Sequence, residues 1–246
     1  DITLKKDWKD LLLGHDCVIH CAGKAHQIDK NQNNSLKNYR LINVETTNKI
    51  AKHCADVGVK RLIFLSSIGV LGNNTNNRKP FSNFDKPNPI ESYAISKFEA
   101  EQGLFEISNN TGLEIVVIRP PLVYGPSAPG NLARLIKLIK TGLPLPFGLV
   151  NNQRSLIGIE NLDDIIIRCI DHLDAKDKTF LVSDGEDLYT PNLIKLIGSS
   201  IGKTPRFFPM PVSVLQLLTK IIGKQRDLDR LIGSLQVDIS HTRELL

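Results

Sequence analysis

The stretch Asp16-Cys-Val-Ile-His-Cys21, followed directly by Ala22-Gly23, decides the fold of this chain. It is short, apolar and β-prone, and it breaks at a glycine, so it predicts a buried strand that ends in a tight turn. A helix is predicted next, over residues 41–57, and it stops at Gly58. A second buried strand, Arg61-Leu-Ile-Phe-Leu-Ser66, follows. The order strand, helix, strand indicates a β-α-β unit.

The same order repeats in the next part of the chain. A polar loop over residues 73–89 leads to a predicted helix over residues 91–108 and then to the apolar run Glu114-Ile-Val-Val-Ile-Arg119. Strands without polar alternation, separated by helices, are typical of a parallel sheet covered on both faces. We therefore predict an α/β fold in which residues 1–125 form a Rossmann-like, doubly wound parallel sheet.

Beyond residue 125 the alternation loosens, and a smaller α/β domain is predicted over residues 126–246. It is partly interleaved with the first domain, because the apolar run Thr179-Phe-Leu-Val182 predicts a strand that returns to the main sheet. The other predicted elements are helices over residues 131–141, 161–173, 191–201 and 212–222 and a strand over residues 155–159.

Composition excludes several classes of partner. The 31 Lys and Arg residues are scattered among 26 Asp and Glu residues, with no basic stripe threaded by aromatics, so the net charge of +5 indicates a solvated surface rather than a nucleic-acid site. No apolar run is long enough to cross a membrane and no signal peptide precedes Asp1, which predicts a cytoplasmic protein without a membrane partner. The four cysteines lack C-x-x-C spacing, so no metal site is predicted.

The run Tyr93-Ala-Ile-Ser-Lys97 places a phenol and an ammonium on one face of a predicted helix. An adjacent cation stabilises phenolate, which would lower the pKa of Tyr93 towards the range of a general base. The spacing alone is common in a lysine-rich chain, but its context adds weight. Ser66 and Ser67 end a buried parallel strand, where open α/β sheets bind ligands, and Ser67 is predicted to meet Tyr93 there. Ser66 is equally well explained as a turn cap.

Taken together in this order, several runs resemble the extended short-chain dehydrogenases/reductases, the NAD-dependent epimerase/dehydratase family. Within it, the closest likeness is to UDP-hexose 4-epimerases and to UDP-sugar 4-ketoreductases of surface-polysaccharide synthesis, including those that form UDP-N-acetylquinovosamine. The resemblance covers essentially the whole chain. Its carriers are Val18-Ile-His-Cys-Ala-Gly23, Asn43-Val44, Lys60-Arg-Leu-Ile-Phe-Leu-Ser-Ser67, Tyr93-Ala-Ile-Ser-Lys97, Ile118-Arg-Pro-Pro-Leu-Val-Tyr-Gly-Pro126, Gln153-Arg-Ser-Leu156, Phe180-Leu-Val-Ser-Asp-Gly-Glu186 and Gly233-Ser-Leu-Gln-Val-Asp238.

The resemblance implies roles for particular residues. Tyr93 matches the catalytic acid/base, Lys97 the residue that holds the nicotinamide ribose and tunes the tyrosine, and Ser67 the hydroxyl that orients the sugar oxygen. The implied cofactor is NAD or NADP. The residues implied to contact it are Asp1, Ile2, Ala22, Gly23, Asn43, Ser66, Tyr93, Lys97, Pro120 and Val123.

The second half is then expected to bind a UDP-sugar. Arg154 matches the arginine that grips the diphosphate, a task that suits a planar donor fork. Asn131 opens a helix nearby, and Arg226 or Arg230 is expected to add a second cationic contact. The resemblance also implies a homodimer formed through the helices of residues 43–57 and 93–108.

Two departures from the family pattern narrow the expectation. No Gly-x-x-Gly-x-x-Gly turn is present, so the first β-α-β unit, with the residue that selects NAD from NADP, is predicted to be missing. The chain is interpreted either as a fragment of a longer gene product or as a truncated protein that no longer binds cofactor well. Ile68-Gly69-Val70 follow Ser67 where related dehydratases carry Asp-Glu, which argues against dehydration. Epimerisation or reduction at C4 remains.

Two other classes are weighed beside this one. A non-catalytic dinucleotide-binding or regulatory protein on the same fold would lack the tyrosine–lysine pair or the strand-end serine. A hydroxysteroid dehydrogenase-like enzyme would need an apolar substrate pocket in place of Arg154 and Asn131. His20, inside the first strand, is interpreted as a structural histidine rather than a catalytic one.

Overall fold

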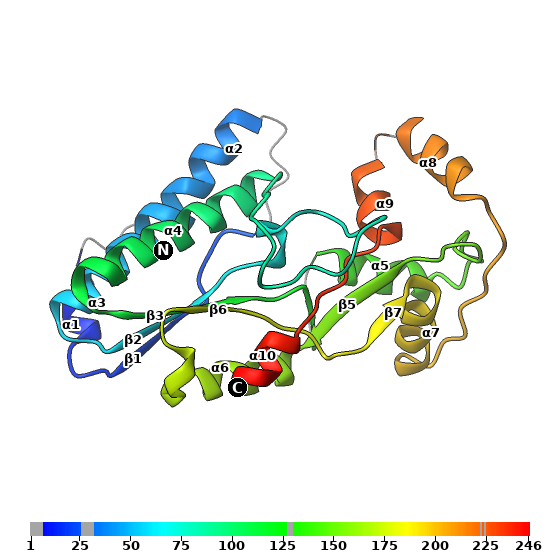
Figure 1. The fold of residues 1–246 in the computed structure, drawn as a ribbon. Coiled ribbons are helices and arrows are strands. Elements are labelled where there is room, and N and C mark those ends of the chain that lie inside the picture. Colours follow the sequence, from blue (N-terminus) through cyan, green and yellow to red (C-terminus); the bar gives the residue numbers. More distant parts are fainter. Residues whose placement is uncertain (1–6, 26–31, 127–129, 222, 224) are drawn as a thin grey trace.

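The computed structural model describes residues 7–25, 32–126, 130–221, 223 and 225–246. Its main sheet has four parallel strands in the order β1-β2-β3-β6 (Figure 1). This confirms the predicted α/β class. The strand predicted at residues 179–182 is β6, which pairs with β3. The four strands are β1 (Cys17–His20), β2 (Arg61–Leu65), β3 (Glu114–Arg119) and β6 (Lys178–Leu181).

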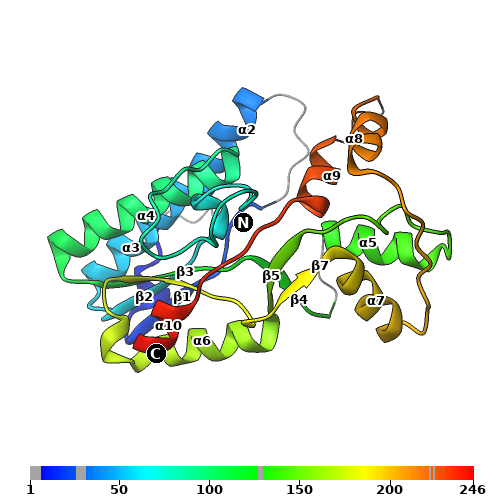
Figure 2. The ribbon, with the colours of Figure 1, turned by 45° about the vertical axis from the view of Figure 1, so that its right-hand side comes forward.

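Helices cover both faces of this sheet, as the doubly wound prediction requires. Figures 1 and 2 show α2, α3 and α4 on one face and α6 and α10 on the other. The helices of the first face, with α1 at its edge, are α1 (Lys9–Leu12), α2 (Gln32–Tyr39), α3 (Thr46–Asp56) and α4 (Ser92–Thr111). Those of the second face are α6 (Ile159–Asp171) and α10 (Ser240–Leu245), with a 3-10 turn at Leu173–Ala175.

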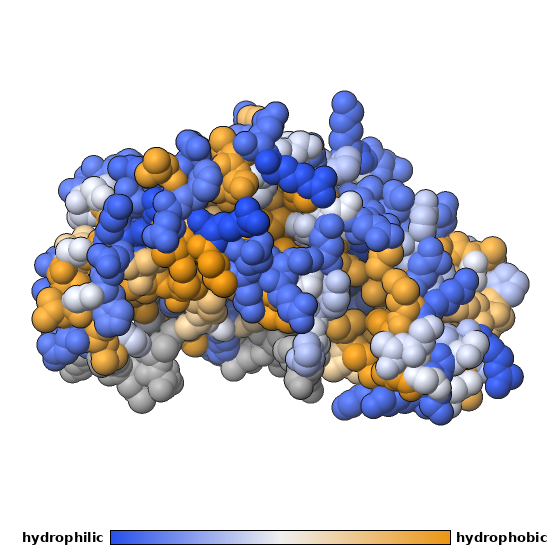
Figure 3. All heavy atoms as spheres, turned by 90° about the horizontal axis from the view of Figure 1, so that it is seen from below, coloured by the Kyte–Doolittle hydropathy of each residue, from blue (hydrophilic) through white to orange (hydrophobic). Residues whose placement is uncertain are grey.

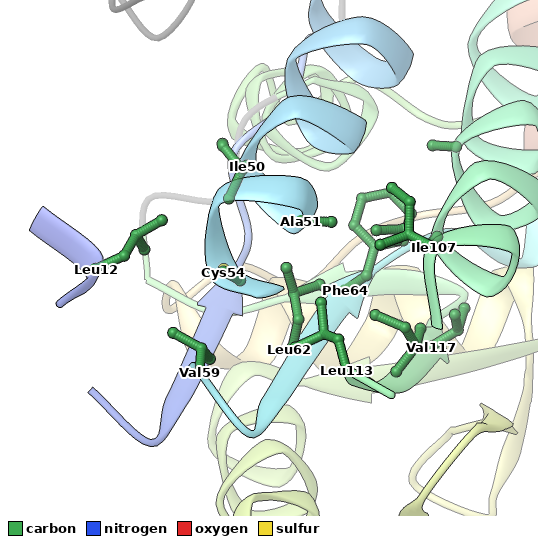
Figure 4. Close-up of a cluster of buried hydrophobic side chains, with 13 residues drawn as sticks. Leu12, Ile50, Ala51, Cys54, Val59, Leu62, Phe64, Ile107, Leu113 and Val117 are labelled. Atoms are coloured by element: carbon green, nitrogen blue, oxygen red, sulfur yellow. The ribbon is translucent and has the colours of Figure 1, made fainter. Parts of the chain in front are cut away.

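Alternation along the strands builds two cores. Leu62 and Phe64 of β2 point to the face of α3 and α4, where they pack with Cys54 and Leu104 (Figure 4). The intervening Ile63 belongs to the opposite cluster, beneath α6. Successive side chains of a strand point to opposite faces, so a continuous apolar run is what a sheet buried on both sides needs.

The helix predicted over residues 41–57 is wrong in its extent and regularity. Helical structure already begins at α2, passes through a π-helical stretch at Arg40–Glu45, and continues as α3. Single-turn π-helical bulges are frequent at functional sites. Here the wide turn contains Asn43, which is buried.

The strands of a second, three-stranded sheet alternate along the chain with the last strand of the main sheet, because two of them precede β6 and one follows it. This second sheet has the order β4-β5-β7, with β4 and β5 parallel and β7 antiparallel to β5. The two short strands β4 and β7 escaped prediction. The strands are β4 (Leu122–Tyr124), β5 (Gln153–Gly158) and β7 (Asp187–Tyr189). The helices of this part are α5 (Asn131–Lys140), α7 (Thr190–Ser200), α8 (Val212–Ile221) and α9 (Gln225–Ile232).

Residues 234–238 join the two sheets. Phe81 N–H donates to Gln236 O at 2.9 Å and Asp238 N–H donates to Phe81 O at 2.8 Å, so this segment pairs with the loop that precedes α4. On its other side, Ser155 N–H of β5 donates to Leu235 O at 2.8 Å. Leu235 and Val237 also pack in one cluster with Leu181 of β6, so the segment contacts both sheets.

The outer surface mixes polar and apolar areas. Seen from below, orange apolar areas lie among blue hydrophilic ones, both on the left half and at the right-hand end (Figure 3). Within the described residues, no helix combines the length and the apolar character that a membrane crossing requires.

His20 is a core residue. Its Nε2 is hydrogen-bonded to Thr47 Oγ1 at 2.9 Å, and its ring stacks on Phe64 with centroids 5.7 Å apart. Burial, and then the charge of Lys97, lower the pKa of His20 to about 4.

This pKa makes stability depend on pH. An unfolded histidine has a pKa of about 6.5, so between pH 4 and 6.5 the unfolded chain binds more protons than the folded one. We expect the contribution of His20 to the free energy of unfolding, measured in urea, to be largest above pH 6.5. It should fall by up to about 3 kcal/mol as the pH approaches 4. His20→Gln, which cannot titrate, should show a shallower fall. Equal slopes for the two proteins would contradict this assignment.

Candidate active site

The carboxyl ends of β1, β2 and β3 meet at one edge of the main sheet. Ala22-Gly23 follow β1, Ser66-Ser67 follow β2, and Pro120 follows β3. Ser66 N–H donates to Ile118 O at 2.7 Å, and Ile68 N–H donates to Pro120 O at 2.9 Å, so the last two ends lie side by side. This is the edge at which open parallel sheets bind ligands.

Helix α4 brings Tyr93 and Lys97 to that edge on consecutive turns. The side chain of Lys97 is buried, its Nζ donates to Leu65 O at 2.8 Å, and it lies 4.4 Å from the ring centroid of Phe64. Burial lowers the pKa of Lys97 to about 8, although the nearby Glu101 opposes this shift. Of its three N–H groups, Leu65 O accepts one within the described part of the chain, which leaves donors for a ligand.

Tyr93 is half-buried in the first turn of α4, and its ring meets Tyr39 edge-on with centroids 6.1 Å apart. Burial, and then Tyr39, raise the pKa of Tyr93 to about 12. Lys97 is not among the causes of this shift, and its ammonium donates to Leu65 O instead. The expectation that Lys97 lowers the pKa of Tyr93 stays a prediction.

Ser67 lies against the start of α4. It precedes the 3-10 turn Ile68–Val70, and its Oγ accepts a hydrogen bond from Gly69 N–H at 3.1 Å. A Cβ on Gly69 would lie 3.4 Å from Ala94 Cβ, so this turn packs on the residue next to Tyr93. Because Ser67 Oγ accepts here, its own O–H proton stays available to donate.

Asn43 braces the turn after β1. Its Oδ1 accepts from Lys24 N–H at 2.8 Å, and its Nδ2 donates to Lys24 O and to Ser96 Oγ at 3.1 and 3.0 Å. Ser96 Oγ in turn donates to Tyr93 O at 2.7 Å. A Cβ on Gly23 would lie 3.2 Å from both Asn43 Oδ1 and Lys97 Nζ, which is tight contact. The turn is thus held so that bare backbone faces the ammonium.

Ser66, unlike Ser67, contacts a buried ion pair. It is buried, and its Oγ donates to Glu101, which forms a two-pronged ion pair with Arg119 at 3.0 and 2.6 Å. Glu101 and Arg119 escaped sequence reasoning. The signal was present, because Glu101 follows Tyr93 and Lys97 at the same four-residue spacing and so shares their helix face.

Arg154 of β5 carries the uncompensated charge of the second sheet. Its Nη1 donates to Arg230 O and Gly233 O at 2.6 and 2.9 Å, and no carboxylate pairs with it among the residues that the structure describes. Burial lowers the pKa of Arg154 to about 10. A half-buried guanidinium without a counter-charge is a site for an anion.

Arg230 connects this cation to the catalytic helix. Its guanidinium pairs with Glu91 at 2.6 Å, and Glu91 is the residue that caps the N-terminus of α4, two positions before Tyr93. Because Arg154 donates to the backbone of Arg230, these two contacts link the guanidinium of Arg154 in β5 to the start of the helix that carries Tyr93. Arg230 itself is already paired, which leaves Arg154 as the better anion ligand.

No contact in the part of the chain that the structure describes bears on the roles of the other residues expected to bind the cofactor or the substrate. Asp1 and Ile2 lie outside the described residues. Asn131 opens α5 and Arg226 lies in α9, but their side chains lie outside the description as well. Pro120 is buried, and Val123 is half-buried in β4 opposite Ile157. These positions remain predictions.

A Rossmann-like sheet with a serine, a tyrosine and a lysine at its carboxyl edge defines the class of short-chain dehydrogenases/reductases. The chain belongs to the NAD dependent epimerase/dehydratase family, which matches residues 1–183. The family expected from the sequence motifs is thereby confirmed, and it is a family of enzymes.

Individual relatives agree with this assignment. A UDP-glucose 4-epimerase of Vibrio cholerae is 42% identical over 247 residues, which cover 100% of this chain and 75% of that protein. An N-acetyl-alpha-D-glucosaminyl-diphospho-ditrans,octacis-undecaprenol 4-epimerase of Escherichia coli O157:H7 is 29% identical over 92% of this chain and 69% of its own. The solved UDP-glucuronic acid 4-epimerase of Bacillus cereus, in complex with NAD, superposes with a TM-score of 0.76 at 21% identity, over 100% of this chain and 72% of that one. This last likeness concerns the fold.

The ion pair beneath the site is open to a direct test. Glu101→Gln leaves the guanidinium of Arg119 buried without a counter-charge, so we expect the free energy of unfolding in urea to fall by about 3 kcal/mol or more. Glu99→Gln on the same helix is the matched control. Its partner Arg40 is exposed, so we expect a loss of less than about 1 kcal/mol. Equal losses in the two variants would show that the buried ion pair contributes no more to stability than the exposed one.

Proposed function

We propose that this protein is an NAD(P)-dependent UDP-sugar 4-epimerase. The observation that carries the proposal is the convergence of Ser67, Tyr93 and Lys97 at one sheet edge, to which Arg230 and Glu91 connect Arg154, a cation with no carboxylate partner among the described residues. The first three groups suit a sugar hydroxyl and Arg154 suits a diphosphate. The name of the relative that is 42% identical agrees with this chemistry.

The residues present fit a nicotinamide cofactor. The segment Ala22-Gly23 offers exposed backbone, Asn43 holds the residue that follows it, and Lys97 Nζ beside Gly23 would donate hydrogen bonds to a ribose hydroxyl. Pro120 and Val123 follow β3 on the neighbouring side of the edge. When bound, NAD(P) accepts a hydride from a carbinol carbon and returns it.

The chain's own residues handle the proton. Ser67 O–H holds the C4 oxygen of the sugar, and the phenolic oxygen of Tyr93 takes the C4 hydroxyl proton and later gives it back. With a pKa of about 12, Tyr93 is a poor base at neutral pH. The ammonium of Lys97, one helical turn away, supplies the positive charge that lowers this pKa once it turns from Leu65 O to the ligand.

Other reactions of the family are less suited to these residues. Ile68 and Val70, in the turn after Ser67, are buried apolar side chains, so this turn offers no carboxylates for water elimination. A 4-ketoreductase would use the same three groups, with NAD(P)H reducing a ketone that arrives as substrate. A hydroxysteroid substrate would leave Arg154 without an anion. A purely binding protein would have no use for the serine beside Tyr93.

The setting of the reaction is part of the proposal. We place the enzyme in the cytoplasm, in the synthesis of sugars for surface polysaccharides, and as a homodimer that pairs through residues 43–57 and 93–108. Sedimentation velocity measures the last point directly, and a monomer at all accessible concentrations would contradict it.

A substrate panel tests the reaction. We expect UDP-glucose or UDP-N-acetylglucosamine to be converted to its C4 epimer, followed by NMR, without net consumption of NAD(P)H. Stoichiometric oxidation of NAD(P)H with a UDP-4-keto-6-deoxy-N-acetylhexosamine alone would identify a ketoreductase instead. Turnover restricted to a lipid diphosphate-linked sugar, or no turnover at all, would overturn the proposal.

Tyr93→Phe isolates the proton transfer. We expect kcat to fall by about 100-fold or more, because removing a positioned acid/base loses a factor of this order, while the melting temperature is unchanged. Tyr39→Phe, which keeps the ring beside Tyr93, is the control and should retain turnover. Normal kcat in Tyr93→Phe would exclude this mechanism.

Arg154→Leu tests the diphosphate site. Losing a charge-assisted contact to a phosphate should raise KM for the UDP-sugar by about 10- to 100-fold, with a smaller change in kcat. Arg154→Lys should recover part of the loss, since it keeps the charge but not the fork. Arg168→Leu, at an exposed arginine of α6, is the control. Unchanged KM in Arg154→Leu would place the diphosphate elsewhere.

A further inference from the structure

The positive charge of the chain is concentrated in one segment. Residues 188–226 contain six basic residues and no acidic one, so this segment carries +6, and the other 207 residues carry the difference from +5, which is −1. The even scatter of charge predicted for the whole chain is wrong for this segment, because whole-chain totals hide a local excess. The six residues are Lys195, Lys203, Arg206, Lys220, Lys224 and Arg226.

This basic segment forms one end of the molecule. Figures 1 and 2 show α7, the connection that follows it, and α8 along the right-hand end, away from the main sheet. Lys195, Lys203, Arg206 and Lys220 are exposed, and none of these four forms an ion pair with another described residue. Their charge therefore faces solvent uncompensated.

Helix α8, within this end, exposes an apolar stripe. Val214, Leu217, Leu218 and Ile221 are 41%, 60%, 48% and 74% exposed, at the i, i+3, i+4, i+7 spacing of one helix face. Leu215, by contrast, is buried against the core of the smaller sheet. The stripe is thus additional to the apolar face that folding uses.

We propose that this end of the molecule docks on an anionic lipid bilayer, with α8 lying in the plane of the interface. Helix α8 presents leucines and an isoleucine beside Lys220, and Lys195, Lys203 and Arg206 are exposed at the same end of the molecule. An apolar stripe together with basic residues gives the two signals that peripheral binding needs. At ten residues α8 is too short to span a bilayer. A second copy is a poor occupant, because it would bring two uncompensated basic ends together.

The test uses the purified protein and vesicles of defined composition. We expect flotation with vesicles of 70% phosphatidylcholine and 30% phosphatidylglycerol, weak flotation with phosphatidylcholine alone, and release as salt shortens the range of the attraction. No flotation with the anionic vesicles at low salt, or flotation that ignores salt and lipid charge, would overturn the proposal. Because flotation is independent of catalysis, this outcome is separate from that of the proposed reaction.

Two double variants test the apolar stripe and the basic charge separately. Leu217→Gln with Ile221→Gln removes apolar side chains and should lower vesicle affinity by about tenfold or more. Lys203→Glu with Arg206→Glu keeps the stripe and should lower affinity for anionic vesicles only. Ile167→Gln on α6, 63% exposed, is the matched control and should bind normally. Unchanged flotation of both double variants, or a stripe variant that loses self-association instead of vesicle binding, would contradict docking on lipid.

Discussion

The buried ion pair between Glu101 and Arg119 is the constraint on which the site depends. Glu101 belongs to the helix that carries Tyr93 and Lys97, and Arg119 ends β3. The hydroxyl of Ser66, at the end of β2, donates to the same carboxylate. One carboxyl group therefore fixes the rotation and height of α4 against two strand ends. A purely apolar contact would tolerate sliding, whereas a desolvated, fully hydrogen-bonded charge pair does not.

This constraint explains why the two adjacent serines differ. A strand that ends at Leu65 sends the next two side chains to opposite sides. Ser66 turns into the protein and donates to the ion pair, whereas Ser67 accepts a hydrogen bond from Gly69 in the turn that packs on the start of α4. The position of Ser67 relative to Tyr93 is thus a consequence of the contact that Ser66 makes. Ser66 therefore stabilises the packing of α4, whereas the hydroxyl proton of Ser67 stays available beside the start of that helix.

Sequence alone predicted the parts of the fold that local pattern controls. The run at residues 114–119 became β3 at the predicted bounds, and β1 ends before Gly23, whose backbone lies beside Lys97. Prediction from sequence failed where tertiary contacts override the local pattern of apolar residues. Glu101 reads as an ordinary surface charge until its partner Arg119 is known, and the π-helical turn around Asn43 has no apolar signature of its own. Three-residue strands such as β7 are likewise too short to carry a period.

Residues 234–238, which contact both sheets, position Arg154 in the candidate site. Arg154 would be a surface residue of β5 if residues 234–238 did not run alongside it and bring the end of α9 over its guanidinium. The same helix carries Arg230, whose guanidinium is paired with Glu91 beside α4. Arg154 and Arg230 were both expected to contact an anion, but they differ in the structure, because only Arg230 has a carboxylate partner among the described residues. Carbonyl oxygens can hold a guanidinium in place without cancelling its charge, and that is what makes Arg154 suited to an anion.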